Sequence, residues 1–300
     1  MTTTQTAWPI LEPDLATILE SEADPVARLA LGEIAAIVLR QAFPKEACQS
    51  LVRHLIDEGL MFESGDDRIE DRAIPVKRVD RWTQQGLNPE QSKRRRIDIG
   101  TSLGNLGDDR EHFLNHSAET HRLFARLFAN RANPIEVVYE NLQRLARGKR
   151  VVTAYEPDGR KYGPAIFRVH YGGYTYGPHF DSVRNRENRT AYAVHKYQHQ
   201  LAGVLCVQNA IRDGVSAQAI LHRQLWNPAI DEVLASGGFY DYAAKNGVAN
   251  VRVELEPGDL YFFNTGVIHE VPGVEGDLPR AVLATFIGYS PDEDEIMVWS

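Results

Sequence analysis

The chain has 300 residues, with 33 basic and 41 acidic side chains and a formal net charge of −8. Its 43% hydrophobic and 25% charged residues exclude an intrinsically disordered chain, and the acidic excess disfavours nucleic acid as a partner. No apolar stretch reaches the length of a membrane span, and the N-terminal residues lack a signal-peptide pattern. Two distant cysteines, Cys48 and Cys206, form no zinc or redox spacing. We therefore expect a cytoplasmic protein with reduced thiols and no membrane partner.

The first half of the chain is predicted to be mainly helical. Apolar residues recur at helical spacing after Pro44, and a second helix is expected over about 109–128. A third helix is expected to follow the Asn-Pro pair at 133–134. The arginine-rich stretch 68–96 is predicted to be a loop around one short strand.

After Arg150 the pattern changes to short β-branched and aromatic runs separated by Gly, Pro, Asn and Asp. Strands are predicted at Ala165–Tyr171, Gln200–Asn209, Ser216–Leu225, Val251–Leu255, Leu260–Asn264 and Ala281–Tyr289. Because segment 227–250 is the least strand-like part of this half, we predict a long loop there that serves as a lid.

This order of elements predicts an α+β protein with a cupin-like β jelly roll supported by an N-terminal helical layer. We expect one catalytic domain over 1–300. Residues 1–149 would form the mainly helical support, and residues 150–300 would form the jelly roll with the site.

The β half contains one His-x-Asp pair, His179 and Asp181, in strand-like sequence. Residues two apart on a strand point to the same side, so both side chains can converge on one point. With ten histidines in the chain, this spacing alone is weak evidence. A further histidine, His269, follows a later predicted strand. Two imidazoles and one carboxylate form the facial ligand set of non-haem Fe(II) and leave positions for a chelating co-substrate and dioxygen.

Arg280 follows His269 and opens the last predicted apolar strand. A buried guanidinium needs an anionic partner, and a carboxylate suits its planar fork. An iron site together with an arginine for a distal carboxylate is what binding of 2-oxoglutarate requires. The sequence therefore points to these four residues as one site.

The segments Phe167–Ser182 and Glu256–Arg280 resemble the two metal-ligand segments of Fe(II)/2-oxoglutarate-dependent oxygenases. The resemblance spans about residues 165–290, and weaker similarity elsewhere points to the carrier-protein-independent halogenases of welwitindolinone biosynthesis and their hydroxylase relatives. It implies a double-stranded β-helix in which His179, Asp181 and His269 bind iron and Arg280 binds the C5 carboxylate of 2-oxoglutarate. It also implies that Tyr171 contacts this co-substrate.

The resemblance implies further that a free small molecule, such as an amino-acid derivative or a specialised metabolite, is oxidised with O2 while 2-oxoglutarate is converted to succinate and CO2. The halogenases replace the carboxylate ligand with a small residue, which makes room for chloride. This chain keeps Asp181. Hydroxylation or another oxidation is therefore expected, and chlorination is not.

Several alternatives use other residues or the same ligands differently. A serine hydrolase would use Ser102 in the Gly-x-Ser-x-Gly segment 100–104, but we expect a turn after it where such an enzyme needs a helix. His112 and His116 have zinc-compatible helical spacing, yet solvated histidines are the expected outcome. A cupin-like protein that binds a metal without turnover, or a dioxygenase independent of 2-oxoglutarate, could use the same three ligands. Arg280 discriminates between these last two and the 2-oxoglutarate enzyme.

Overall fold

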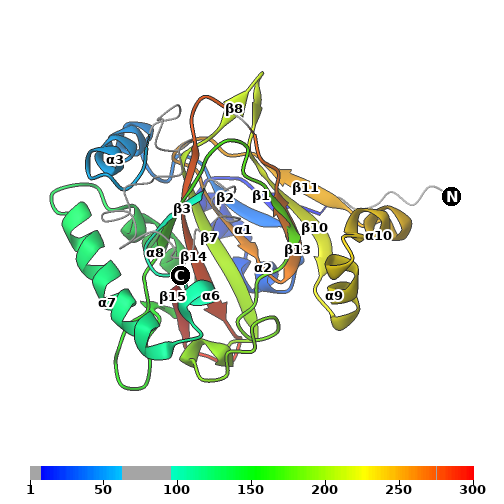
Figure 1. Ribbon diagram of the computed structural model, residues 1–300. Helices are drawn as coiled ribbons and strands as arrows, with labels where there is room; N and C mark the ends of the chain where they lie inside the picture. The colour runs from blue at the N-terminus through cyan, green and yellow to red at the C-terminus, as the bar shows by residue number, and fades with distance from the viewer. Residues whose placement is uncertain (1–7, 63–95, 275) are drawn as a thin grey trace.

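The computed structural model describes residues 8–62, 96–274 and 276–300 (Figure 1). Its helices are α1 (Leu15–Ser21), α2 (Pro25–Ala30), α3 (Lys45–Asp57), α6 (Leu103–Leu106), α7 (Arg110–Leu127), α8 (Pro134–Leu145), α9 (Pro228–Ala235) and α10 (Phe239–Asn246), with a 3-10 turn, η2 (Ala193–Lys196). Its strands are β1 (Ile10–Leu11), β2 (Ala36–Leu39), β3 (Arg96–Ile99), β4 (Arg150–Thr153), β5 (Ile166–His170), β6 (Tyr176–His179), β7 (His199–Gln208), β8 (Ile211–Arg212), β9 (Val215–Ser216), β10 (Ala219–Leu225), β11 (Asn250–Val253), β12 (Leu260–Asn264), β13 (Val267–Val271), β14 (Arg280–Tyr289) and β15 (Glu295–Trp299).

Two sheets form the centre of this α+β fold. The larger sheet has nine strands with the path β1-β2-β12-β7-β14-β15-β4, and β5 joins it through β14 while β3 joins it through β5. The smaller sheet has four strands in the order β11-β10-β13-β6. Most neighbours are antiparallel, but β1–β2 and β4–β15 are parallel pairs. The N-terminal half therefore supplies β1, β2 and β3 to the large sheet in addition to helices.

The strands of the large sheet alternate between two apolar layers, as the period of a β-strand requires. On β7, Leu201 and Leu205 belong to the core shared with helices α3, α7 and α8. Their neighbours Ala202 and Val204 belong to a second core shared with the small sheet. Figure 1 shows α3, α7 and α8 on one side of the large sheet, and α9 and α10 beyond the small sheet. A residue on the central strands β7 and β14 thus faces either the helices or the space between the sheets.

The three predicted helices and the six predicted strands of the β half are all present, with shifts of a few residues at their ends. The predicted loop over 68–96 lies outside the described residues, except that Arg96 begins β3. Segment 227–250 is not a loop: it contains α9 and α10. Asn227 caps α9 by accepting a hydrogen bond from the backbone N–H of Ala229, and Pro228 occupies the first turn.

Candidate metal centre and its pocket

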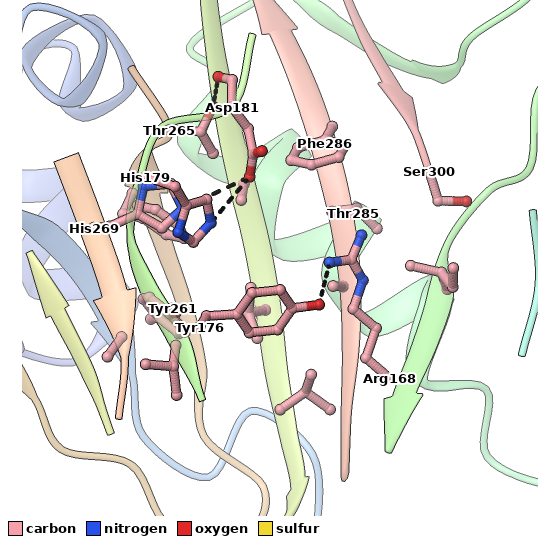
Figure 2. Close-up of a pocket in the computed structure, with 18 of the residues that line it drawn as sticks. Arg168, Tyr176, His179, Asp181, Tyr261, Thr265, His269, Thr285, Phe286 and Ser300 are labelled. Carbon is pink, nitrogen blue, oxygen red and sulfur yellow. Dashed lines mark hydrogen bonds and ion pairs between the residues drawn. The ribbon is translucent and has the colours of Figure 1, made fainter. Parts of the chain in front are cut away.

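A cavity lies between the two sheets (Figure 2). Its walls are mostly apolar, with valine, alanine and phenylalanine side chains from β7, β12 and β14. The four residues expected to form the site, His179, Asp181, His269 and Arg280, all line it. Asp181 is the only acidic residue among the described residues that line the cavity. Mostly apolar walls with a few convergent polar groups are typical of a small-molecule site.

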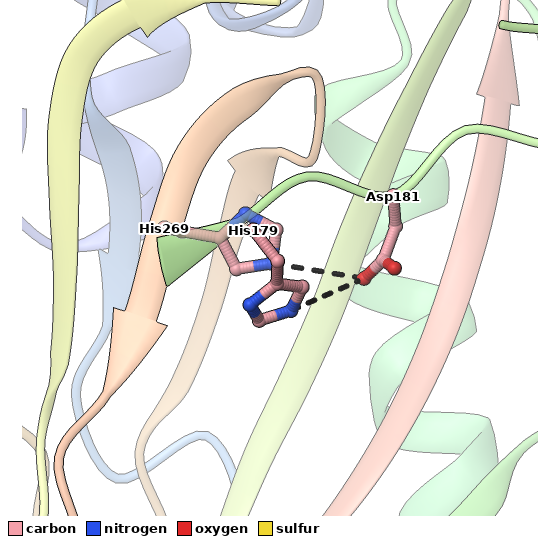
Figure 3. Close-up of side chains that lie close together, drawn as sticks. All are labelled: His179, Asp181 and His269. Carbon is pink, nitrogen blue, oxygen red and sulfur yellow. Dashed lines mark ion pairs between the residues drawn. The ribbon is translucent and has the colours of Figure 1, made fainter. Parts of the chain in front are cut away.

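Strand pairing brings the three candidate metal ligands together (Figure 3). His179 ends β6 and lies opposite His269 in the antiparallel β6–β13 pair, so the two imidazole centroids are 4.2 Å apart. The Nε2 atoms of both rings lie 3.7 Å from Oδ2 of Asp181. The sequence predicts His269 just beyond a strand, whereas it lies in the middle of β13. The register of β13 with β6, which the sequence does not specify, brings His269 next to His179.

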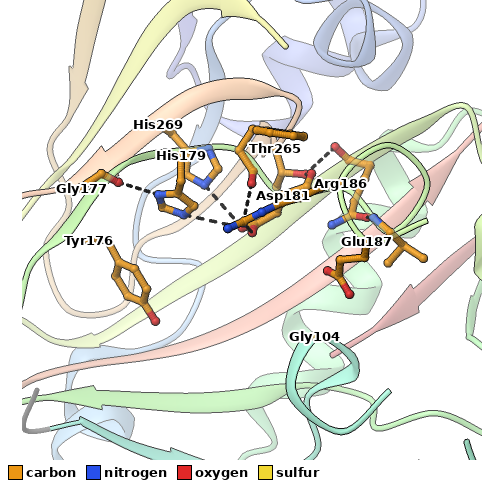
Figure 4. A network of polar contacts seen from close by, with 12 residues as sticks. Gly104, Tyr176, Gly177, His179, Asp181, Arg186, Glu187, Thr265 and His269 are labelled. Atoms are coloured by element: carbon orange, nitrogen blue, oxygen red, sulfur yellow. Dashed lines mark hydrogen bonds and ion pairs between the residues drawn. The ribbon is translucent and has the colours of Figure 1, made fainter. Parts of the chain in front are cut away.

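Each imidazole is oriented by a backbone carbonyl two residues earlier on its own strand, and Figure 4 shows the contact between Gly177 and His179. Nδ1 of His179 lies 2.7 Å from the carbonyl oxygen of Gly177, and Nδ1 of His269 lies 2.9 Å from that of Val267. A carbonyl can only accept, so Nδ1 carries the proton in both rings and Nε2 is left as a lone-pair donor. Both free nitrogens face Asp181, which is the arrangement that a metal ligand set needs.

The backbone and a nearby cation fix the Asp181 carboxylate in turn. The Asp181 N–H donates to the Thr265 carbonyl at 3.0 Å, and the Thr265 hydroxyl donates to the Asp181 carbonyl at 2.9 Å. Arg186 donates to Oδ1 of Asp181 at 3.1 Å, which leaves Oδ2 toward the imidazoles. This aspartate therefore has one oxygen held by the protein and one oxygen directed at the cluster.

The protonation states at neutral pH fit metal binding. Burial, assisted by the neighbouring His269, lowers the pKa of His179 to about 4, so its imidazole is neutral. Burial alone would raise the pKa of Asp181, but the electrostatic influence of the adjacent His269 and His179 and of Arg168 outweighs burial and lowers that pKa. Two imidazoles and one carboxylate, with ligand atoms within 4.8 Å of one another, are the facial donor set typical of non-haem Fe(II).

Arg280 occupies the opposite wall of the cavity, at the start of β14. It is buried and contacts no carboxylate among the described residues; its Nη1 lies 3.3 Å from Nδ1 of His170. Burial and the charge of Arg280 hold the pKa of His170 well below its usual range, so this ring is neutral and accepts from the guanidinium. Nε2 of His170 is buried without a partner. This corner has donors in excess and suits an anionic ligand.

Arg168 on β5 lines the same wall, and Tyr176 on β6 of the small sheet extends toward it across the cavity. Nη1 of Arg168 donates to the Tyr176 hydroxyl at 3.2 Å, and Arg96 donates to the same oxygen. In Figure 2 the Tyr176 ring lies between the imidazoles and Arg168. Burial raises the pKa of Tyr176, so the phenol stays protonated.

The structure does not bring Tyr171 into this cavity. Its hydroxyl donates to the Phe62 carbonyl at 3.1 Å and accepts from the Phe62 N–H at 2.9 Å, within the core beneath the helices. On β5 and just beyond it, Phe167, Val169 and Tyr171 share the helical side. Arg168 and His170 therefore face the cavity instead, although the sequence motifs predict no role for either residue. Side chains alternate along a strand, so this period of two could have identified Arg168 and His170 once the side faced by one residue of β5 was known.

The other candidate residues lie elsewhere. A short helix, α6, does follow Ser102 directly, contrary to the expected turn, but the Ser102 hydroxyl accepts a hydrogen bond from Asn105 at 3.0 Å and is buried. His116 is buried rather than solvated, because its Nδ1 lies 2.9 Å from the Thr101 hydroxyl, while His112 is exposed. Among the described residues, neither His112 nor His116 belongs to a group of three side chains that could bind a metal.

The fold and the His-x-Asp…His cluster define an Fe(II)/2-oxoglutarate-dependent oxygenase. The chain belongs to the family of carrier-protein-independent halogenases of the WelO5 type, whose model matches residues 10–300. No curated protein matches it significantly. None of the described helices has the length and apolarity to cross a membrane.

Two solved structures share the fold. Both are of an N-substituted L-amino acid dioxygenase from Burkholderia ambifaria AMMD, one of them in complex with alpha-KG. Their sequences are 16% identical to this chain, their TM-scores are 0.56 and 0.57, and the match covers 92% of this chain and 90% of theirs.

Proposed function

We propose that this protein is an Fe(II)/2-oxoglutarate-dependent dioxygenase that hydroxylates, or otherwise oxidises, an unactivated C–H bond of a free small molecule. The observation that carries the proposal is the cluster of His179, Asp181 and His269, with both Nε2 atoms free and 3.7 Å from one carboxylate oxygen. These three residues would bind Fe(II). Arg280, buried without a carboxylate partner among the described residues, would bind the C5 carboxylate of 2-oxoglutarate.

Bound iron and 2-oxoglutarate supply the dioxygen chemistry, with succinate and CO2 as products from the co-substrate. The residues of this chain bind, orient and shield. Asp181 would fill one position of the metal, which disfavours chlorination although the family is named for halogenases. The apolar walls of the cavity would exclude water and hold a substrate C–H bond toward the metal.

The two facing sheets are consistent with a double-stranded β-helix in one catalytic domain. The helices of segment 227–250 pack against the outside of the metal segment, because Phe180, Ile230, Phe239 and Ile268 form one apolar cluster. We retain this segment as a candidate lid. An amino-acid derivative or a specialised metabolite is the proposed substrate class, and the neighbour named an N-substituted L-amino acid dioxygenase supports the first of these.

Succinate formation tests this function. Protein loaded with Fe(II) without oxygen and mixed with 2-oxoglutarate should form succinate when exposed to air, and candidate substrates should stimulate it. Arg280→Ala should weaken 2-oxoglutarate binding by about 10–100-fold, since a hydrogen bond to a charged group contributes about 1.5–3 kcal/mol. Unchanged co-substrate affinity in this variant would favour a 2-oxoglutarate-independent dioxygenase. Metal binding with no succinate under any condition would favour a cupin-like binding protein.

A further inference from the structure

Arg168 is a second guanidinium in the cavity and differs from the other arginines near it. Arg96 forms an ion pair with Asp98 on its own strand. Arg168 lies within ion-pair distance of no carboxylate among the described residues, and its Nε is buried without a hydrogen-bond partner. Its one hydrogen bond goes to the uncharged Tyr176 hydroxyl. Asp98 lies opposite Arg168 in the β3–β5 register but pairs with Arg96, and Asp181 feels the Arg168 charge only from beyond ion-pair distance. The protein thus leaves Arg168 without a directly contacting counter-charge, which is costly for a guanidinium that lines a mostly apolar cavity.

The charges in the proposed holoenzyme make the same point. This inference rests on the proposed function. With Fe(II) and the 2-oxoglutarate dianion bound, the charges of the metal, Asp181, Arg280 and the dianion sum to zero. Arg186, which contacts Asp181, is half-exposed, so solvent screens its charge. His170 is neutral, because burial and the adjacent guanidinium groups lower its pKa. The positive charge of Arg168 then remains on the wall of the cavity, and the substrate is the component left to neutralise it.

Tyr176 completes a site for an oxygen anion. Its hydroxyl accepts hydrogen bonds from both Arg96 and Arg168 and donates to no described residue, so its proton is available to a ligand. The Tyr176 ring also lies 5.6 Å from the His179 ring, centroid to centroid. One tyrosine side chain therefore separates the anion site from the metal ligands (Figure 2).

We propose that the substrate carries a carboxylate, held by the Arg168 guanidinium and the Tyr176 hydroxyl, with its apolar body along the valine and phenylalanine side of the cavity. The planar guanidinium fork matches a carboxylate. The side chains that would receive the apolar body include Val204, Val282 and Phe286. The anchored end fixes which substrate carbon reaches the metal, so Arg168 is a specificity-determining residue.

Matched acids and amides test the proposal by binding. The probes are 3-phenylpropionate, N-acetyl-L-leucine and N-benzoylglycine, each beside its primary amide. Calorimetric titrations use the Fe(II)-loaded protein without oxygen and with saturating 2-oxoglutarate, so that no acid takes the Arg280 position. We expect at least one acid to bind at least tenfold more tightly than its amide. Arg168→Met should remove this preference, Arg168→Lys should retain part of it, and Arg223→Met, at an exposed position of β10, should leave it intact.

The 2-oxoglutarate affinity of each variant distinguishes loss of the substrate site from loss of the co-substrate site or of the fold. In Arg168→Met this affinity should change less than threefold, which also shows that the variant is folded. The proposal is overturned if no acid in the panel binds or if acids and amides bind with equal affinity. It is also overturned if Arg168→Met keeps the preference for acids, or if this variant weakens 2-oxoglutarate binding as strongly as Arg280→Ala does. Failure of the wild type to bind 2-oxoglutarate would instead overturn the proposed function.

Discussion

The two walls of the cavity satisfy their polar groups in opposite ways. On the small-sheet side, His179 and His269 are each fixed by a carbonyl of their own strand, and Asp181 is held by Thr265 and Arg186. On the large-sheet side, the guanidinium and imidazole groups of β5 and β14 contact no carboxylate among the described residues. This difference indicates which ligand each wall would bind. The first wall presents oriented electron-pair donors, which suit a metal ion. The second wall presents hydrogen-bond donors, which suit anions.

Removal of one ligand from the metal wall should produce the largest effect. Loss of a residue that only orients a ligand weakens metal binding by about 10–100-fold, so His269→Ala should weaken Fe(II) binding by more than about 100-fold. Equilibrium dialysis against Fe(II) without oxygen measures it. His170→Ala, on the opposite wall, is the matched control and should retain metal. Equal loss of Fe(II) binding in both variants would contradict the conclusion that only the first wall supplies metal ligands.

A medium effect is expected from pH, through His170 on the second wall. Burial, with help from Arg280, lowers its pKa well below 6.5, so the unfolded chain binds more protons than the folded one between these values. The free energy of unfolding of the metal-free protein should therefore fall as pH falls from 7.5 to 5. His170→Gln should remove up to about 2 kcal/mol of that fall.

Urea unfolding at the two pH values measures this change. His112→Gln, at an exposed helical position, is the control and should keep the full pH dependence of the wild type. An identical fall in His170→Gln and wild type would mean that the second wall does not hold its histidine neutral.

The smallest effect should come from Tyr171, which lies behind the second wall. Tyr171→Phe removes both hydrogen bonds to Phe62 and should lower the free energy of unfolding by about 1 kcal/mol. Its 2-oxoglutarate affinity should change less than twofold, since the hydroxyl points away from the cavity. Chemical denaturation and calorimetry on the same preparation measure the two quantities. Weaker 2-oxoglutarate binding with an unchanged free energy of unfolding would indicate that Tyr171 contacts the co-substrate.

Local pattern was sufficient for much of this protein. Helical periodicity and an Asn-Pro start located α8, and β-branched runs located the strands of the β half. The same Asn-Pro signal opens α9 at Asn227, so the helices of segment 227–250 were within reach of sequence reasoning. His179 and Asp181 could be paired because residues two apart on an extended chain share a side, which is a property of the backbone alone.

Tertiary structure decided which residues meet across strands. The approach of His269 to His179 depends on the register of β13 with β6. That Arg168 and His170 face the cavity while Tyr171 faces the helices depends on how β5 pairs with β14, opposite Val282 and Arg280. A sequence carries the alternation of a strand but not its phase relative to a distant sheet. The net charge of −8 likewise conceals a cavity wall in which guanidinium groups outnumber carboxylates. Composition averages over the whole surface, whereas only the fold determines which few charges share one enclosed space.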